Sequence, residues 1–290
     1  MLSLHTNNAA LSAQNAIGKT QNNLSTAMTR LSTGYRINTA SDDAAGLQIA
    51  TRLKAQTSGM AMAMKNTQNA TSMLQTASGA FNEVSNMLVR MKDLATQAAD
   101  VSASTDDKEA MQAEFDALGK ELSNVMKNTT FGGTNLIAGT NGTLSSDMQF
   151  QIGASSTETM NVSVADDLTK LTDALSNLAT SYNDATQSTL GSEIATTSAA
   201  NGTIGELADA IDAVSKVNSA LGATINRLDH INSNLANIST NTESATGRIM
   251  DTDFATESAS MTSNQMLLQA GTAMLKQSNS MSSLVMSLLQ

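Results

Sequence analysis

The sequence predicts a mainly α protein: a long antiparallel helical rod with coiled-coil helices at both termini and a small β-hairpin region near the middle of the chain. Three observations predict this fold. Apolar residues repeat every seven positions through several long segments, which is the pattern of helices packed along a narrow seam. The 290 residues contain no proline, so the strongest helix breaker is absent. Near the middle of the chain the period changes to two, which indicates short strands.

The segment from Met60 to Ala98 has the most sustained repeat. Two sets of positions seven apart run along it, and eleven of the twelve residues are apolar: Met60, Thr67, Leu74, Phe81, Leu88 and Ala95, then Ala63, Ala70, Ala77, Val84, Met91 and Ala98. This predicts one helix with a single packed seam, roughly 58 Å long at ~1.5 Å per residue. Such a length is typical of a rod and exceeds what a compact core holds.

Both ends of the chain carry apolar stripes on helices that have almost no charge. The spacing predicts a polymerisation core made of Ala10, Ile17, Leu24 and Leu31, then Leu267, Met274, Met281 and Leu288, with a neighbouring stripe of Met261, Leu268 and Leu275. Surface helices normally carry charge on their solvent face. Two interpretations remain open: the ends pair only with each other, or they become ordered when many copies pack. The adjacent C-terminal stripes favour the second, because one partner would bury only one stripe.

Helix caps and further periodic segments complete the expected order of elements. Gly34 can end the first helix in the left-handed conformation, and Ser41 with two aspartates can start the next. A second rod helix is expected over 107–127, and a third, antiparallel to the first, from Ile204. Between them, alternating apolar residues predict the two strands of a hairpin; these residues are Met148, Phe150 and Ile152, then Met160, Val162 and Val164.

This order predicts two domains, because the chain runs out and returns with both ends together. Residues 1–45 with 248–290 are expected to form a discontinuous, terminal coiled-coil domain. Residues 46–247 are expected to form the rod domain, with the β-hairpin at 147–165 and an exposed tip at 166–203. The tip is rich in Ser, Thr, Asn and Ala, and only a short helix is expected near its start.

The residue types needed for catalysis, metal binding or cofactor binding are mostly missing. The chain has no Cys and only two histidines, His5 and His230, without the spacing of a zinc-ligand pair. The run from Gly18 to Thr20 resembles the end of a phosphate-binding loop, but the upstream glycine position holds Ala13. Paired aspartates before helices are expected to act as caps. The sequence therefore predicts a structural protein with no catalytic residues, no metal and no cofactor.

Charge and hydropathy limit the partners and the location. A net charge of −10 argues against a nucleic-acid partner, which needs a basic face. No apolar run reaches the ~20 residues that cross a membrane. The first twenty residues lack a basic head followed by an apolar block, so no ordinary cleavable secretory signal is expected.

Five motifs resemble the terminal signatures of bacterial flagellin. They are Leu31 to Asn38 (LSTGYRIN), Asp42 to Leu47 (DDAAGL), Arg248 to Glu257 (RIMDTDFATE), Gln269 to Leu275 (QAGTAML) and Ser287 to Gln290 (SLLQ), the last with Gln where Arg is common. The resemblance covers residues 1–140 and 204–290, and the short middle resembles a flagellin that lacks large outer domains. It implies a homopolymer, the extracellular flagellar filament used for motility, with the termini as its helical inner core.

The same resemblance implies how the chain reaches the filament and what it meets there. Flagellins leave the cell through the flagellum's own channel, largely unfolded and without a cleavable signal peptide. The resemblance implies an export chaperone on the C-terminal helix, followed by contacts with filament cap and junction proteins.

Recognition by a flagellin-sensing Toll-like receptor is a further implication of the resemblance. The matching residues are Arg90, Leu94, Gln97 and Glu114, of which the first three share one helix face. Their surroundings differ from the family pattern: Val89 stands where Gln is common, Asp93 in place of Glu and Thr96 in place of Val. The alternative for these residues is a solvated or inter-subunit face.

Two other functions remain open. A hook–filament junction protein has similar termini and a different middle, and a secreted helical adaptor or effector would bind a host protein. Electron microscopy separates them, since long filaments indicate a flagellin, whereas stable monomers or dimers favour the others. An enzyme would need a pocket with converging titratable groups.

Overall fold

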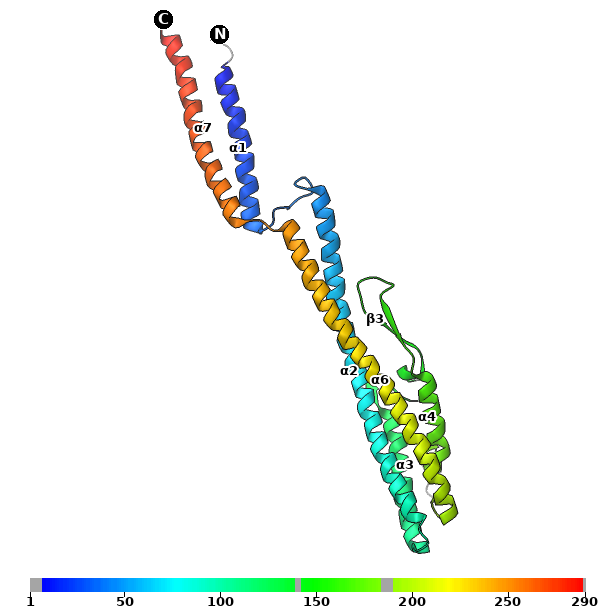
Figure 1. The fold of residues 1–290 in the computed structure, drawn as a ribbon. Helices are drawn as coiled ribbons and strands as arrows, with labels where there is room; N and C mark the ends of the chain where they lie inside the picture. The colour runs from blue at the N-terminus through cyan, green and yellow to red at the C-terminus, as the bar shows by residue number, and fades with distance from the viewer. Residues whose placement is uncertain (1–6, 139–141, 184–189, 289–290) are drawn as a thin grey trace. The chain divides into compact units, whose positions relative to one another are not determined.

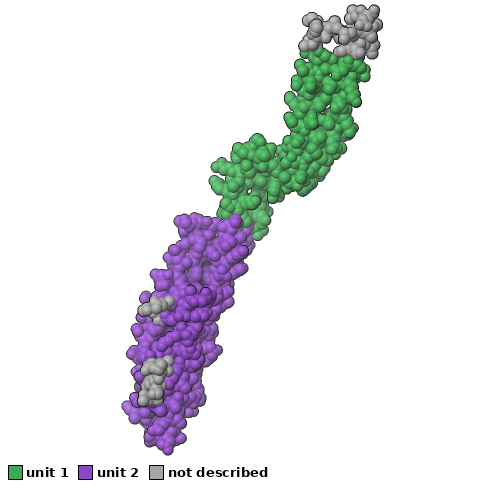
Figure 2. Space-filling view, turned by 180° about the vertical axis from the view of Figure 1, so that it is seen from behind, with its two compact units in different colours: residues 1–57, 240–290 green, residues 58–239 purple. Residues whose placement is uncertain are grey.

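The structure, a computed structural model, describes residues 7–138, 142–183 and 190–288; for residues 281–288 it describes the backbone only. The described chain is mainly helical (Figure 1). It divides into a terminal unit, residues 1–57 with 240–290, and a second unit, residues 58–239, which Figure 2 shows in green and purple. The terminal unit extends further into both long helices than the predicted terminal domain.

Two long helices run antiparallel through the second unit. Helix α2 spans Ala44–Ala98, and helix α6 spans Thr197–Met250. Met60 packs with Leu235, while Ser78 Oγ lies 2.6 Å from Asn218 Oδ1 in a hydrogen bond, so the chain directions are opposite. The predicted antiparallel pair of long helices is confirmed, although both helices begin earlier than the repeats that predict them, α2 at Ala44 instead of Met60 and α6 at Thr197 instead of Ile204.

The seam of α2 is completely buried. All twelve heptad positions are at most 4% exposed. Thr67 is the one polar residue among them, and its hydroxyl donates to the Met64 carbonyl oxygen over 2.8 Å. A threonine fits such a seam because its polar atom is satisfied within its own helix.

Helix α3, Thr105–Asn128, begins at a capping box formed by Ser104 and Asp107. The Ser104 hydroxyl accepts from the Asp107 amide at 3.2 Å, and the Asp107 carboxylate accepts from the Ser104 amide at 3.1 Å. These two bonds satisfy donors that the first turn of a helix leaves free. The helix expected over 107–127 is confirmed, and its Phe115 and Leu122 are buried in the core.

The predicted β-hairpin is confirmed. Strands β3 (Met148–Gln151) and β4 (Thr159–Val162) pair antiparallel, with Met148 opposite Val162. The hairpin turn lies against α2, because a Cβ added to Gly59 would be 2.7 Å from Cβ of Ala154. Among the described residues, three short elements lie between α3 and the hairpin: β1 (Thr130–Phe131), β2 (Thr134–Asn135) and the 3-10 turn η2 (Thr143–Ser145).

The expectation of an exposed tip at 166–203 is wrong for much of this segment. Helix α4 (Ala165–Leu178) is followed by a single helical turn, α5 (Thr180–Asn183). Four leucines of α4 are at most 3% exposed: Leu168, Leu171, Leu175 and Leu178. Their spacing of three and four residues places them on one face, which packs into the core.

Polar contacts hold the later part of this segment on α3. Gln112 is 1% exposed, and its side-chain nitrogen donates to Asp116 over 2.9 Å and to Glu193 over 2.7 Å. Its side-chain oxygen accepts from the Ile194 amide over 2.8 Å. A composition rich in Ser and Thr could not reveal these contacts, because their partners lie about eighty residues apart in sequence. Residues 184–189 of the predicted tip lie outside the described residues.

Candidate functional site

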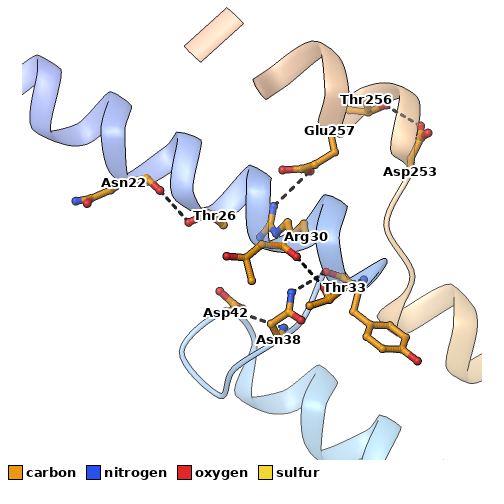
Figure 3. A network of polar contacts seen from close by, with 11 residues as sticks. Asn22, Thr26, Arg30, Thr33, Asn38, Asp42, Asp253, Thr256 and Glu257 are labelled. Carbon is orange, nitrogen blue, oxygen red and sulfur yellow. Dashed lines mark hydrogen bonds and ion pairs between the residues drawn. The ribbon is translucent and has the colours of Figure 1, made fainter. Parts of the chain in front are cut away.

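Helices α1 (Asn8–Thr33) and α7 (Phe254–Leu288) lie side by side and antiparallel within the terminal unit (Figure 1). At one end the Asn7 side-chain amide donates to Ser278 Oγ over 3.1 Å. At the other end Arg30 pairs with Glu257 at 3.7 Å, as Figure 3 shows. Between these ends, a Cβ added to Gly271 would be 2.9 Å from Cγ1 of Ile17. The two helices are therefore closely packed at Gly271.

One of the two predicted stripes on α7 lies along this contact. Its residues are half-buried, as are the predicted stripe residues of α1: Met261, Leu268 and Leu275 on α7, and Ala10, Ile17, Leu24 and Leu31 on α1. Ala27 of α1 is 2% exposed. The structure thus brings seven of the predicted polymerisation-core residues together within one chain.

The other stripe of α7 is left in solvent. Leu267 is 56% exposed and Met274 is 69% exposed, and the neighbouring Met266 is 60% exposed. Ala270 and Ala273, between them along the helix, are exposed as well. The side chains of Met281 and Leu288 lie outside the described residues, while the helix backbone continues through both. We call the exposed residues Met266, Leu267, Ala270, Ala273 and Met274 the outer stripe.

The terminal helix pair has few charges, and its threonine hydroxyls are satisfied internally. On α1 the only charged side chains are Lys19 and Arg30, and Arg30 is paired with Glu257. Four threonines of α1 donate to the carbonyl oxygen four residues earlier: Thr20, Thr26, Thr29 and Thr33. Figure 3 shows Thr26 and Thr33. These four threonines can be covered by another helix without leaving their hydroxyl donors unpaired.

Backbone pairing joins the two chain segments next to this helix pair. Gly34 ends α1 with φ of 77°, the predicted left-handed conformation. Tyr35 and Asp251 form an antiparallel bridge, flanked by bonds from the Arg36 amide to the Met250 carbonyl (2.6 Å) and from the Thr252 amide to the Gly34 carbonyl (3.0 Å). Sequence reasoning missed this pairing, because a bridge of one residue pair has no periodicity.

Three aspartates organise the same region. Asp43 accepts from the Gly46 amide over 2.8 Å at the start of α2, so it is the cap that the paired aspartates predict. Asp42 accepts from the Thr39 and Asn38 amides, and these bonds lower the pKa of Asp42 below its ordinary value of 3.8. Figure 3 shows Asp42 beside Asn38. Bonds from the Thr256 hydroxyl and the Ala255 amide likewise lower the pKa of Asp253.

These lowered pKa values predict a loss of stability in acid. A carboxylate with a lower pKa in the folded state stabilises the fold above its ordinary pKa, and this contribution disappears as the pH falls through the folded value. We expect the circular-dichroism melting temperature of the parent protein to drop between about pH 5 and about pH 2. The Asp42→Asn variant should drop less over this range, whereas Glu243→Gln, an exposed change in the same unit, should follow the parent. Equal slopes for the parent and Asp42→Asn would contradict the assignment.

The four receptor-contact candidates do not share one accessible face. Arg90 and Glu114 are joined across α2 and α3 by an ion pair of 2.7 Å, and both side chains are about half exposed. Gln97 is exposed. Leu94 is 2% exposed and belongs to the core, so the expectation that it faces outward with Arg90 and Gln97 is wrong. Periodicity places the three on one side of α2, but it could not show that the core covers Leu94.

The described residues contain no group of three or more His, Asp or Glu side chains placed to hold a metal ion. Among them, no helix is both long enough and apolar enough to span a membrane. His230 is exposed, and His5 lies outside the described residues. The features that stand out are therefore the outer stripe and the paired connector segments.

Two family models match the chain. The bacterial flagellin N-terminal helical region matches residues 4–142, and the bacterial flagellin C-terminal helical region matches residues 204–289. These matches contain the helix pair, the outer stripe and both connector segments.

Full-length relatives carry the same description. Flagellin A of Vibrio anguillarum is 33% identical over an alignment of 381 residues that covers 100% of both chains. Flagellin B of Vibrio cholerae is 33% identical over 377 residues, with 99% of each chain covered. Because both alignments exceed the 290 residues of this chain, these relatives contain segments with no counterpart here, as expected of a short form.

A solved structure of a candidate flagellar hook-associated protein from Vibrio parahaemolyticus also superposes on the chain. The TM-score is 0.56 at 14% sequence identity, and the match covers 72% of this chain and 100% of that chain. This likeness shows a shared fold alone. The family models and the relatives matched over their whole length show more: this chain belongs to the bacterial flagellin family.

Proposed function

We propose that this chain, a structural subunit of the bacterial flagellar filament, polymerises by burying the outer stripe of α7 against neighbouring copies. The observation that carries the proposal is the exposure of Leu267 and Met274, at 56% and 69%, on a helix whose other stripe already packs on α1. In this proposal residues 1–45 with 248–290 form the filament-core domain, and residues 46–247 form the rod domain.

Burial of apolar area supplies the driving force. The contribution is ~25 cal/mol per Å² of apolar surface removed from water. Ordering the chain termini opposes it, at ~1–2 kcal/mol for each backbone residue that becomes fixed. Assembly is therefore favourable only when many such side chains are covered at once, which explains why both termini are required in this proposal.

Truncation tests this proposal. Chains that lack residues 1–30 or 260–290 should remain soluble and should not grow on filament seeds, because each deletion removes one helix of the terminal pair. Light scattering and electron microscopy report the growth, with full-length protein as the control. Seeded growth of either truncated chain would refute the proposed role of the termini.

The outer stripe also suggests a partner for the subunit before it assembles. We propose that an export chaperone covers α7 until the subunit leaves the cell through the flagellar channel, without a cleavable signal peptide. Exposed Leu267 and Met274 support this idea, because apolar side chains left in solvent promote association. Contacts with filament cap and junction proteins belong to the same proposal.

Recognition by a flagellin-sensing Toll-like receptor is a separate proposal, supported by the exposed pair of Arg90 and Glu114 with Gln97 nearby on α2. Leu94 would not touch the receptor; from within the core it would keep in place the part of α2 that carries Arg90 and Gln97. Arginine is enriched among residues that dominate interfaces, and its removal costs ~2 kcal/mol or more there. We expect Arg90→Ala monomer to be at least about tenfold weaker in a receptor reporter assay. Lys65→Ala, an exposed change on the same helix, should match the parent, and equal potency of both variants would exclude Arg90 as a contact.

A further inference from the structure

Methionine sulfurs are the chemically reactive groups of the outer stripe. The chain has 18 methionines and no cysteine, so thioethers are its only sulfur atoms. Several are protected in the second unit, where each is at most 6% exposed: Met60, Met91, Met126, Met148 and Met160. Met274 and Met266, at 69% and 60%, are more exposed than any other methionine whose side chain the structure describes.

We propose that oxidation of Met266 and Met274 blocks assembly of the free subunit, and that assembly in turn protects them. The inference rests on the proposed burial of the outer stripe. The oxidant is a two-electron oxygen donor such as hydrogen peroxide. Its O–O bond breaks, one oxygen forms a new bond to the thioether sulfur, and the other leaves as water. The sulfur is oxidised to the sulfoxide while the peroxide is reduced.

The apolar side chains of the outer stripe make the change costly for assembly. A sulfoxide carries a strong acceptor oxygen, and burial without a donor opposes association. The rest of the outer stripe offers none, since its other members are Leu267, Ala270 and Ala273. The nearby hydroxyl of Thr272 already donates to the Gln269 carbonyl over 2.9 Å. The expected loss is about tenfold in seeded growth rate for each oxidised side chain.

Met62 provides a matched control. It is 54% exposed, it lies on a long helix like the other two, and it belongs to the second unit instead of the terminal helix pair. Its oxidation should proceed at a similar rate and should leave assembly unchanged. Leucine is the suitable replacement at each position, because it has nearly the same volume and no sulfur.

The experiment compares Met266→Leu/Met274→Leu with Met62→Leu, both in a background with Met281→Leu and Met286→Leu, whose native side chains lie outside the described residues. Each monomer is treated with the same dose of hydrogen peroxide, freed of oxidant and added to filament seeds. Mass spectrometry gives the sulfoxide content at each methionine. The growth of each treated variant is compared with that of the same variant left untreated. We expect treated Met62→Leu to lose most of its untreated growth, and treated Met266→Leu/Met274→Leu to keep most of its own untreated growth. Preformed filaments of the background protein should gain sulfoxide at Met62 but not at positions 266 and 274.

Three results would overturn the inference: normal growth of oxidised Met62→Leu, equal inhibition of both variants, or sulfoxide at 266 and 274 in intact filaments. Untreated protein separates this failure from failure of the proposed function. If untreated terminal truncations grow on seeds, the proposed function is wrong. If they do not grow, yet oxidised Met62→Leu does, only the oxidation inference fails.

Discussion

A subunit in which Leu267 and Met274 are both replaced by glutamine is expected to fold normally and to lose filament growth. Both side chains are more than half exposed in the single chain, so the change removes little packing there. In the polymer, each replaced side chain would lose the ~1.5–3 kcal/mol of free energy that burial of the apolar side chain contributes. The loss for both positions is about 3–6 kcal/mol per subunit. The critical concentration for growth should therefore rise by about two to four orders of magnitude. Sedimentation of filaments from seeded mixtures measures this critical concentration.

The matched control replaces Met62 and Val89 by glutamine, since these side chains are 54% and 48% exposed in the second unit. This variant should retain the parent critical concentration. The circular-dichroism melting curves of both double variants should overlay that of the parent monomer. Growth of Leu267→Gln/Met274→Gln at the parent concentration would show that the outer stripe is not a polymer contact.

Valine in place of Gly271 is expected to separate α1 from α7. A Cβ at this position would lie 2.9 Å from Cγ1 of Ile17, which is closer than real Cβ atoms approach their neighbours. Relief requires that the helices move apart or that Ile17 changes rotamer, and such overpacking costs ~1–3 kcal/mol. The contact between α1 and α7 buries few large side chains that could offset this cost, because its seam includes Ala10, Ala27 and Gly271. Helical signal from the termini should fall at room temperature, and seeded growth should be lost.

Gly18 supplies the comparison for that substitution. It lies in the middle of α1, and a Cβ added there meets no atom within 4 Å, leaving aside its own helix and chain neighbours. Gly18→Val should therefore leave the α1–α7 contact intact, and its effect on helix stability should be small and favourable, since valine is a better helix former than glycine. Equal loss of helical signal in Gly18→Val and Gly271→Val would mean that close packing at Gly271 does not set the stability of the pair.

Local patterns predicted the parts of this fold that depend on local physics. The α2 seam follows from a seven-residue repeat, and Gly34 ends α1 and Asp43 begins α2 for reasons that a few neighbouring residues decide. The burial of Leu94 depends on the packing of distant core residues around its side of α2. Gln112 and Glu193 meet although 81 residues separate them, and Tyr35 pairs with Asp251 through backbone atoms alone. Such long-range contacts cannot be recognised from the periodicity or the composition of the sequence.

The same limit applies to the candidate site. The sequence predicted two stripes on the C-terminal helix, but periodicity treats them alike. Only the packing of α1 distinguishes the half-buried Leu268 from the exposed Leu267 one residue away. A one-residue step rotates a helix by ~100°, so the choice of partner face decides which side chain remains available for other copies.

The threonine hydroxyls of α1 lower the cost of removing water from a helix whose sequence is rich in polar residues. Each of the four hydroxyls already holds a carbonyl of the preceding turn, so drying this surface breaks fewer hydrogen bonds to water than the count of Ser and Thr suggests. Methyl groups and amides then make up most of what a neighbour would touch. Covering these four side chains therefore leaves none of their own hydroxyl donors without a partner.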